Sequence, residues 1–211
     1  MDSLIPTNRK SLLTSKSLGV WRGNSCLFHE LNFELAAGQI AIVTGQNGTG
    51  KTTLLRVLAG IYQSNEGQVK WRGHNTQELN FTTKSDIAYQ GHLDGLKKEF
   101  TVAENLAFVR HLCGGDTSIA KLIKELRLTP YYNRQIRYLS AGQLRRVALA
   151  CMRVKPATLW LLDEPLTNLD SKGAALVVSW LTDHANSGGV AVISTHQPNN
   201  FIDIATIEIE L

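Results

Sequence analysis

The sequence lacks any apolar run that could cross a bilayer. Its longest such stretches, residues 158–162 and 190–193, are far shorter than the roughly 20 residues that a transmembrane helix needs. Residues 1–13 hold no apolar segment of the kind found in a secretory signal, and they include Asp2 beside Arg9 and Lys10. The chain is therefore not predicted to cross a membrane by itself.

Cysteine is scarce as well, and the three cysteines, Cys26, Cys113 and Cys151, lie far apart in the chain. An odd number without paired spacing argues against a disulfide framework or a cysteine metal site. The six histidines also lack the spacing of metal ligands. We therefore expect reduced cysteines that serve in packing, in a reducing compartment.

The remaining composition is that of an ordinary globular protein, with 43% hydrophobic and 19% charged residues. A length of 211 residues supports one substantial core but not two domains, so we expect a short tail over residues 1–10 and a single domain over residues 11–211. The net charge of +4 is compatible with nucleic acid or an anionic membrane surface, but a solvated positive surface is the favoured interpretation.

Short apolar runs predict the strands of an α/β core. Strands are expected at residues 17–21, 31–35, 40–44, 68–72, 86–89, 158–162, 190–194 and 206–211. Residues 40–44, 158–162 and 190–194 are apolar almost throughout, which is typical of parallel strands buried on both faces.

Helical patterns separate these strands. Helices are expected after residue 53, at about 101–112, at 119–126, from residue 140 and at 171–185. Capping boxes mark two of the starts, one formed by Thr101 with Glu104 and one by Ser140 with Gln143. A helical subdomain at about 93–155 is therefore predicted to interrupt a core formed by residues of about 11–92 and 156–211.

A glycine-rich segment lies between the strand at 40–44 and the helix that follows it. It matches the pattern of glycine, four residues, then Gly-Lys-Ser/Thr, and reads Gly45-Gln46-Asn47-Gly48-Thr49-Gly50-Lys51-Thr52-Thr53. Glycines let the backbone point its N–H groups at phosphate oxygens, and the helix N-terminus adds a positive dipole. Lys51 can reach the β- and γ-phosphates, and the Thr52 hydroxyl can bind Mg2+. The segment predicts a site for a nucleoside triphosphate with Mg2+.

Two carboxylates follow the apolar strand at 158–162. Adjacent residues at a strand end point in opposite directions, so Asp163 and Glu164 can serve two different roles in one site. Asp163 would hold the Mg2+ shell, and Glu164 would polarise the attacking water. An Asp-Glu pair alone is usually a solvated turn, but beside a phosphate loop it predicts the second half of a hydrolytic site.

Taken in order, these residues resemble those of ATP-binding cassette (ABC) ATPases. Residues 139–143, Leu-Ser-Ala-Gly-Gln, look like the family's signature segment; residues 166–170 resemble its dimer-contacting loop, which ends at Asp170; and His196 resembles its switch histidine. The resemblance covers residues of about 11–211. It implies a P-loop NTPase fold of ABC type, with a parallel-sheet core, an antiparallel β edge and an inserted helical subdomain.

The resemblance also implies how ATP is bound. Two copies would face each other as an ATP-sandwich dimer, with each ATP between one copy's phosphate loop and the other copy's signature residues Ser140, Gly142 and Gln143. His196 would hold the γ-phosphate and act with Lys51 and Glu164 as a catalytic residue. Trp21 is suitably placed to stack on adenine.

Two departures from the family pattern stand out. Ala141 replaces the glycine that is more frequent in the signature, a small change that should leave the turn intact. The glutamine that usually joins the Mg2+ shell is expected at position 92, where this chain has His92, while Gln90 lies two residues earlier. Gln90 or His92 could therefore fill that role.

The segment after Tyr89 is similar to that of the ATPase subunits of cytochrome c maturation haem exporters, which also tend to have a histidine here, followed by a glycine-aliphatic-lysine run. This likeness implies an energising subunit that associates peripherally with multi-spanning membrane subunits of a haem-export complex. The expected location is the cytoplasmic face of the bacterial inner membrane, or alternatively the matrix face of the mitochondrial inner membrane.

Other functions remain open at this stage. The nucleotide site would look the same in the ATPase of another small-molecule exporter, because specificity lies in partner subunits. An ABC ATPase that acts on nucleic acid is suggested only by the basic charge, and nucleic acid is not an expected partner. A nucleotide-dependent binding module without hydrolysis is disfavoured by the presence of Glu164 and His196.

Overall fold

The computed structural model describes residues 10–92 and 95–211, so most of the predicted tail at residues 1–10 lies outside the described residues. Within them the strands are β1 (Ser11–Arg22), β2 (Ser25–Ala36), β3 (Ile40–Thr44), β4 (Glu66–Trp71), β5 (His74–Asn75), β6 (Ile87–Gln90), β7 (Leu159–Asp163), β8 (Val190–Ser194) and β9 (Ile207–Glu210). The α-helices are α1 (Lys51–Leu58), α2 (Phe81–Lys84), α3 (Val102–Cys113), α4 (Ile119–Glu125), α5 (Ala141–Val154) and α6 (Ser171–Asn186).

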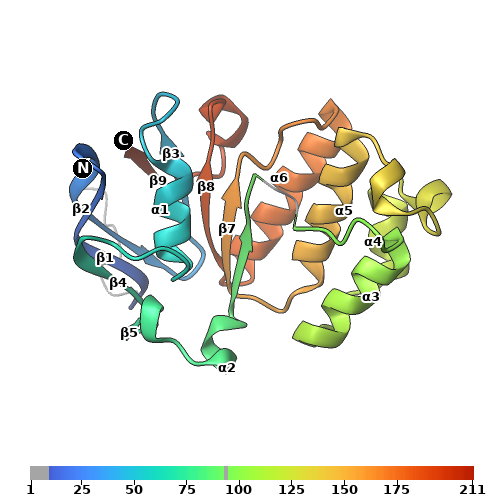
Figure 1. Cartoon of the computed structure of the whole chain (residues 1–211), viewed down its shortest axis with the longest axis horizontal. Helices are drawn as coiled ribbons and strands as arrows, with labels where there is room; N and C mark the ends of the chain where they lie inside the picture. The colour runs from blue at the N-terminus through green and yellow to red at the C-terminus, as the bar shows by residue number, and fades with distance from the viewer. Residues whose placement is uncertain (1–9, 93–94) are drawn as a thin grey trace, which may run out of the picture.

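A parallel sheet with the strand order β6-β7-β8-β3-β9 forms the centre of the molecule. The second sheet has the order β2-β1-β4-β5 and is antiparallel. The predicted fold class is thus confirmed, and the antiparallel strands form a sheet of their own. In Figure 1, α1 lies between the antiparallel strands and the parallel sheet, while α5 and α6 cover the other face.

Each face of the parallel sheet packs into its own core. Val190 and Val192 of β8 face the cluster that includes Leu54 of α1, whereas Ala191 and Ile193 face the cluster built with α5 and α6. This alternation follows from the two-residue repeat of a strand. Because β3, β7 and β8 are buried on both faces, their sequences are apolar almost throughout, as predicted.

The predicted strands at 17–21 and 31–35 are too short. Strands β1 and β2 form a long hairpin around Gly23, with register shifts along their pairing. These register shifts interrupt the two-residue alternation that would have indicated the full length of each strand. The short strand β5 was not predicted either, since two residues carry no periodicity.

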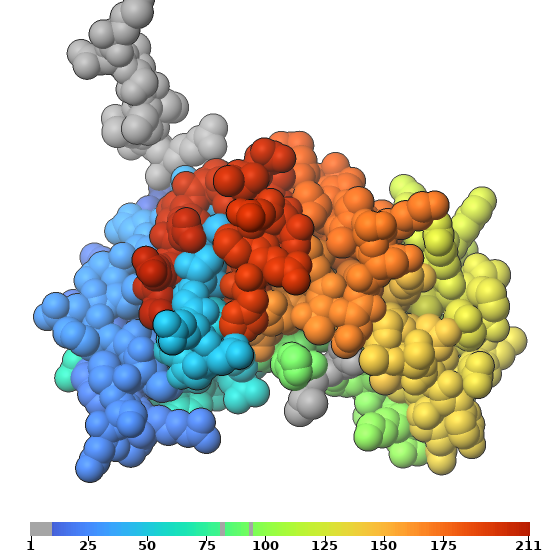
Figure 2. Space-filling model, turned by 90° about the horizontal axis from the view of Figure 1, so that it is seen from above, coloured from blue at the N-terminus to red at the C-terminus, as the bar shows by residue number. Residues whose placement is uncertain are grey.

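Helices α3, α4 and α5 lie together at one end of the molecule, opposite the N-terminal strands (Figures 1 and 2). Both predicted capping boxes are present, at Thr101 with Glu104 and at Ser140 with Gln143. The boundaries of a separate helical subdomain stay a prediction.

The cysteines are free, but only Cys151 is buried in packing, and burial raises the pKa of its thiol to about 12. Cys113 is partly exposed and Cys26 is exposed, so the expectation that all three serve in packing was wrong.

Candidate nucleotide and hydrolysis site

The phosphate loop connects the end of β3 to the start of α1. Gly50, the N-cap of α1, has φ 108°, and no side chain caps the helix, so its first N–H groups can bind an anion. Gly45 has φ 138°, and a Cβ there would lie 2.5 Å from the carbonyl oxygen of Leu211. Glycine is therefore required at both positions by conformation, and at Gly45 by close packing as well.

Lys51 is 7% exposed and folds back over the loop. Its Nζ donates hydrogen bonds to the carbonyl oxygens of Gly45 at 2.8 Å and Gln46 at 2.9 Å. Thr49 also donates to the Gln46 carbonyl, at 3.1 Å. These bonds hold the ammonium group beside the helix N-terminus, where phosphate oxygens would bind.

Asp163 is buried at the end of β7, between two hydroxyl groups. Its Oδ2 accepts a hydrogen bond from Thr52 Oγ1 at 2.8 Å, and its Oδ1 accepts one from Ser194 Oγ at 2.5 Å. Neighbouring strands bring these groups together, because Asp163 pairs with Ser194 in the parallel register of β7 and β8. A carboxylate beside a hydroxyl is the hard oxygen donor set that Mg2+ prefers, so Thr52 and Asp163 fit the predicted ion.

Glu164 and His196 face each other at the adjacent strand ends. The carboxylate Oε1 of Glu164 lies 3.3 Å from His196 Nε2, and its Oε2 accepts a hydrogen bond from the His196 backbone N–H at 3.4 Å. Oε1 is buried and accepts no hydrogen bond from the described residues. The Glu164 side chain also lines a cavity, and a carboxylate in that place is suited to take a proton from a water molecule.

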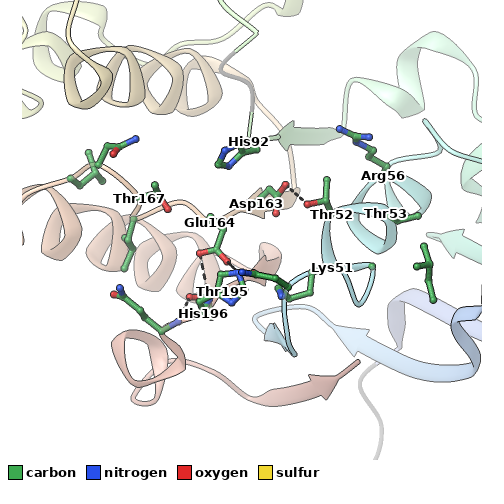
Figure 3. A pocket seen from close by; sticks show the side chains of 18 of the residues that line it. Lys51, Thr52, Thr53, Arg56, His92, Asp163, Glu164, Thr167, Thr195 and His196 are labelled. Atoms are coloured by element: carbon green, nitrogen blue, oxygen red, sulfur yellow. Dashed lines mark hydrogen bonds and ion pairs between the residues drawn. The ribbon is translucent and has the colours of Figure 1, made fainter. Parts of the chain in front are cut away.

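These groups line one cavity of about 810 Å³ (Figure 3). Lys51, Thr52, Thr53 and Arg56 approach from α1, Asp163 and Glu164 from the end of β7, and Thr195 and His196 from the segment after β8. Asn47, Gly48, Gly50 and the loop at residues 166–169 also line it. The structure therefore brings the predicted phosphate loop, acidic pair and histidine into one site.

The cavity also distinguishes the two candidates for the missing glutamine. His92 lines the cavity with Lys51 and Asp163. Gln90 is buried, donates a hydrogen bond to the Gly91 carbonyl at 3.2 Å, and lines a different groove. His92 thus occupies the position from which a side chain can reach the nucleotide, although its role in the Mg2+ shell stays a prediction.

Trp21 is not among the residues that line the cavity. Its ring packs against Gly19, where a Cβ would lie 2.6 Å from the ring, and its backbone N–H donates to Asn65 Oδ1 at 2.9 Å. Arg22 and Leu27 line the cavity instead, at the β1–β2 hairpin. Sequence reasoning missed both, because the direction of a side chain near a hairpin depends on strand register.

The signature residues lie outside this cavity. Ser140 and Gln143 cap α5 reciprocally, with Gln143 Oε1 accepting from the Ser140 N–H at 2.9 Å. Gly142 touches the neighbouring loop, since a Cβ there would lie 2.7 Å from the Asn168 carbonyl oxygen. The departure at Ala141 leaves the helix start intact, as expected.

Asp170 is the N-cap of α6. Its carboxylate accepts a hydrogen bond from the Gly173 N–H at 2.9 Å, which lowers its pKa, and the nearby Arg146 guanidinium at 2.9 Å lowers the pKa further. The structure gives Asp170 a local capping contact, and its role between two copies stays a prediction.

Comparison with known proteins gives the same assignment as the site geometry. The sequence profile of the family described as "ABC transporter" matches residues 28–167. The chain is 40% identical over 188 residues to the "Cytochrome c biogenesis ATP-binding export protein CcmA" of Yersinia pseudotuberculosis, covering 88% of this chain and 86% of that protein. The protein of the same name from Vibrio cholerae is 37% identical, covering 88% of this chain and 91% of its own length.

Solved structures agree in fold. An ATP-binding subunit of an ABC transporter superposes with a TM-score of 0.86 at 21% identity, covering 95% of this chain and 86% of that one. A nucleotide-free ATP-binding cassette gives a TM-score of 0.75 at 19% identity, with 93% and 85% covered. Among the described residues, no helix has the length and apolar character needed to span a bilayer. The chain belongs to the ABC transporter family, as one of its ATP-hydrolysing subunits.

Proposed function

We propose that this chain hydrolyses ATP with Mg2+ to energise haem export in cytochrome c biogenesis. The hydrolysis of ATP is supported by the Glu164 carboxylate, which faces His196 at 3.3 Å and lines a cavity shared with Lys51 and Asp163. The second part is supported by 36–40% identity, over about 88% of the chain, to ATP-binding export proteins named for cytochrome c biogenesis.

The cavity supports a direct displacement at the γ-phosphate. The phosphate loop binds the β- and γ-phosphates, and a water oxygen attacks the γ-phosphorus as the bond to the β–γ bridging oxygen breaks. The Glu164 carboxylate accepts the water proton, while His196 donates a hydrogen bond to the γ-phosphate. ADP and inorganic phosphate are the products.

Thr52 and Asp163 would hold Mg2+, which supplies positive charge against the phosphate oxygens. The remaining positive charge comes from this chain, through Lys51 and the N-terminus of α1. Since both oxygens of Asp163 already accept hydroxyl hydrogen bonds, its carboxylate is oriented before nucleotide binds.

The proposed site is completed by a second copy of the chain. Ser140, Gly142 and Gln143 do not line the cavity of their own chain, yet they lie at the N-terminus of the 14-residue helix α5. A helix N-terminus stabilises an anion. In the proposed dimer these residues contact the γ-phosphate bound to the partner copy, which gives the ATP-sandwich arrangement.

The proposed partners are the multi-spanning membrane subunits of a haem-export complex. The chain would bind them peripherally, on the cytoplasmic face of the bacterial inner membrane or on the matrix face of the mitochondrial one. The support is the likeness to export proteins of several bacteria.

A complementation experiment tests the proposal. In the host, deletion of the gene should remove covalently bound haem from c-type cytochromes, as seen by haem staining, and leave b-type cytochromes unchanged as the control. The wild-type gene should restore the c-type cytochromes and Glu164→Gln should not. Normal c-type cytochromes in the deletion strain, together with a defect in export of another compound, would instead establish the alternative cargo.

A further inference from the structure

Arg145 on α5 is a nearly fully buried cation, with 4% exposure. Its Nη2 donates to the carbonyl oxygens of Asp163 and Glu164, both at 2.7 Å, and its Nη1 donates to the Gly91 carbonyl at 3.2 Å. Its Nε lies 3.4 Å from the Pro165 carbonyl. Burying a charge costs free energy unless hydrogen bonds compensate it, and here one guanidinium joins three separate segments of the chain.

The peptide that Arg145 binds is strained. Glu164 has φ 49°, a left-handed conformation that a residue with a Cβ adopts only when its surroundings impose it. Its N–H donates to the Ser194 carbonyl at 3.1 Å, and its own carbonyl accepts from Arg145. Glu164 is therefore held from both sides, and the direction of its carboxylate depends on this conformation.

The segment at Gly91, which Arg145 also binds, leads to a second residue of the cavity lining. Gly91, whose carbonyl accepts from Arg145, directly precedes His92, which lines the cavity. Tyr89 and Gln90, just before it, line a separate groove together with residues of α3 and α5. Arg145 thus connects the Glu164 peptide, the His92 segment and α5 through a single side chain.

We propose that Arg145 is a positioning residue for hydrolysis. It does not line the cavity, and it acts by fixing the Glu164 peptide and the His92 segment in one geometry. The planar guanidinium carries five N–H donors in a fixed fork, whereas a lysine ammonium offers three donors from one point, so lysine cannot reproduce the arrangement. The proposal rests on the ATPase activity of this chain and is independent of the transported compound.

The test uses the full-length purified chain and the variants Arg145→Lys and Arg145→Met. The control is Arg153→Gln, which changes another arginine of the same helix that packs over Trp160 and Trp180, away from the cavity. Three quantities are measured for each protein: the melting temperature, the Kd of a fluorescent ATP analogue, and kcat per nucleotide-binding site. Counting sites by nucleotide binding removes any unfolded fraction from kcat.

We expect Arg145→Lys and Arg145→Met to bind nucleotide within about 3-fold of the wild type and to lose about 10-fold or more in kcat, because a small misplacement of reacting groups is costly. Arg153→Gln should keep its kcat. If Arg145→Met does not fold, Arg145→Lys decides alone. A wild-type kcat per site in Arg145→Lys, or a loss of affinity as large as the loss of kcat, would overturn the proposal. An inactive wild-type chain would instead count against the proposed function.

Discussion

The assignment of Glu164 as the base makes a specific prediction for Glu164→Gln. The two side chains have the same shape, and the amide oxygen can still accept the His196 backbone N–H that Glu164 Oε2 accepts at 3.4 Å. What is lost is the proton affinity of the carboxylate, since a neutral amide does not take up a proton near neutral pH. The negative charge 3.3 Å from His196 Nε2 is lost as well.

The expected magnitude follows from this difference. Loss of a general base lowers kcat by about 10²- to 10⁴-fold, which steady-state phosphate release measures directly. The Kd for ATP should be equal or lower, because one negative charge beside the γ-phosphate is removed. With ATP bound but not cleaved, light scattering should show a particle of about twice the 23.3 kDa of one chain.

A matched control is Glu210→Gln, which makes the same chemical change on β9, outside the cavity lining. It should retain both kcat and affinity. If Glu164→Gln hydrolysed ATP within about 3-fold of the wild-type rate, another group would have to take the proton. If Glu164→Gln weakened ATP binding as strongly as turnover, the residue would act in binding and the reasoning would be wrong.

Three further predictions follow from the site. Lys51→Ala removes a charged donor to phosphate and should weaken ATP binding by about 10-fold or more in calorimetry, so an unchanged Kd would contradict its role. Ser194→Ala leaves the buried Asp163 carboxylate one hydrogen bond short, and we expect about 1–3 kcal/mol less stability in thermal unfolding; an unchanged melting temperature would show that the bond contributes nothing. Arg22→Ala should raise the Kd for ATP by about 3- to 10-fold, since Arg22 lines the cavity and a guanidinium can stack on adenine. Trp21→Ala should leave the Kd within about 2-fold of the wild-type value. The reverse result would support the adenine-stacking role of Trp21.

Local sequence was sufficient to predict a feature where one short segment determines both the backbone conformation and the chemical groups. The loop from Gly45 to Thr52 specifies its own turns and helix start, and the strand before Asp163 is recognised by its apolar run. The capping boxes at Thr101 and Ser140 are likewise complete within four residues. These features were therefore predicted at their observed places.

Other features depend on which segments meet in space. The sequence leaves Gln90 and His92 as alternatives, and only the path of the chain after β6 puts His92 at the cavity and Gln90 in the groove beside α3. The orientation of Trp21 is similar, because the register of the β1–β2 hairpin directs its ring to Gly19. A two-residue repeat makes such directions sensitive to a shift of one position.

The sequence by itself determined that this protein binds and cleaves a nucleoside triphosphate, because those groups lie on contiguous motifs with fixed spacing. Only the tertiary structure decided how the catalytic carboxylate is supported. Ser194 and Arg145 are 30 and 19 positions away from Glu164, and both reach it through backbone and side-chain contacts that no local pattern encodes. A strained, buried peptide is stabilised by distant groups, so its supports become visible only when the chain is folded.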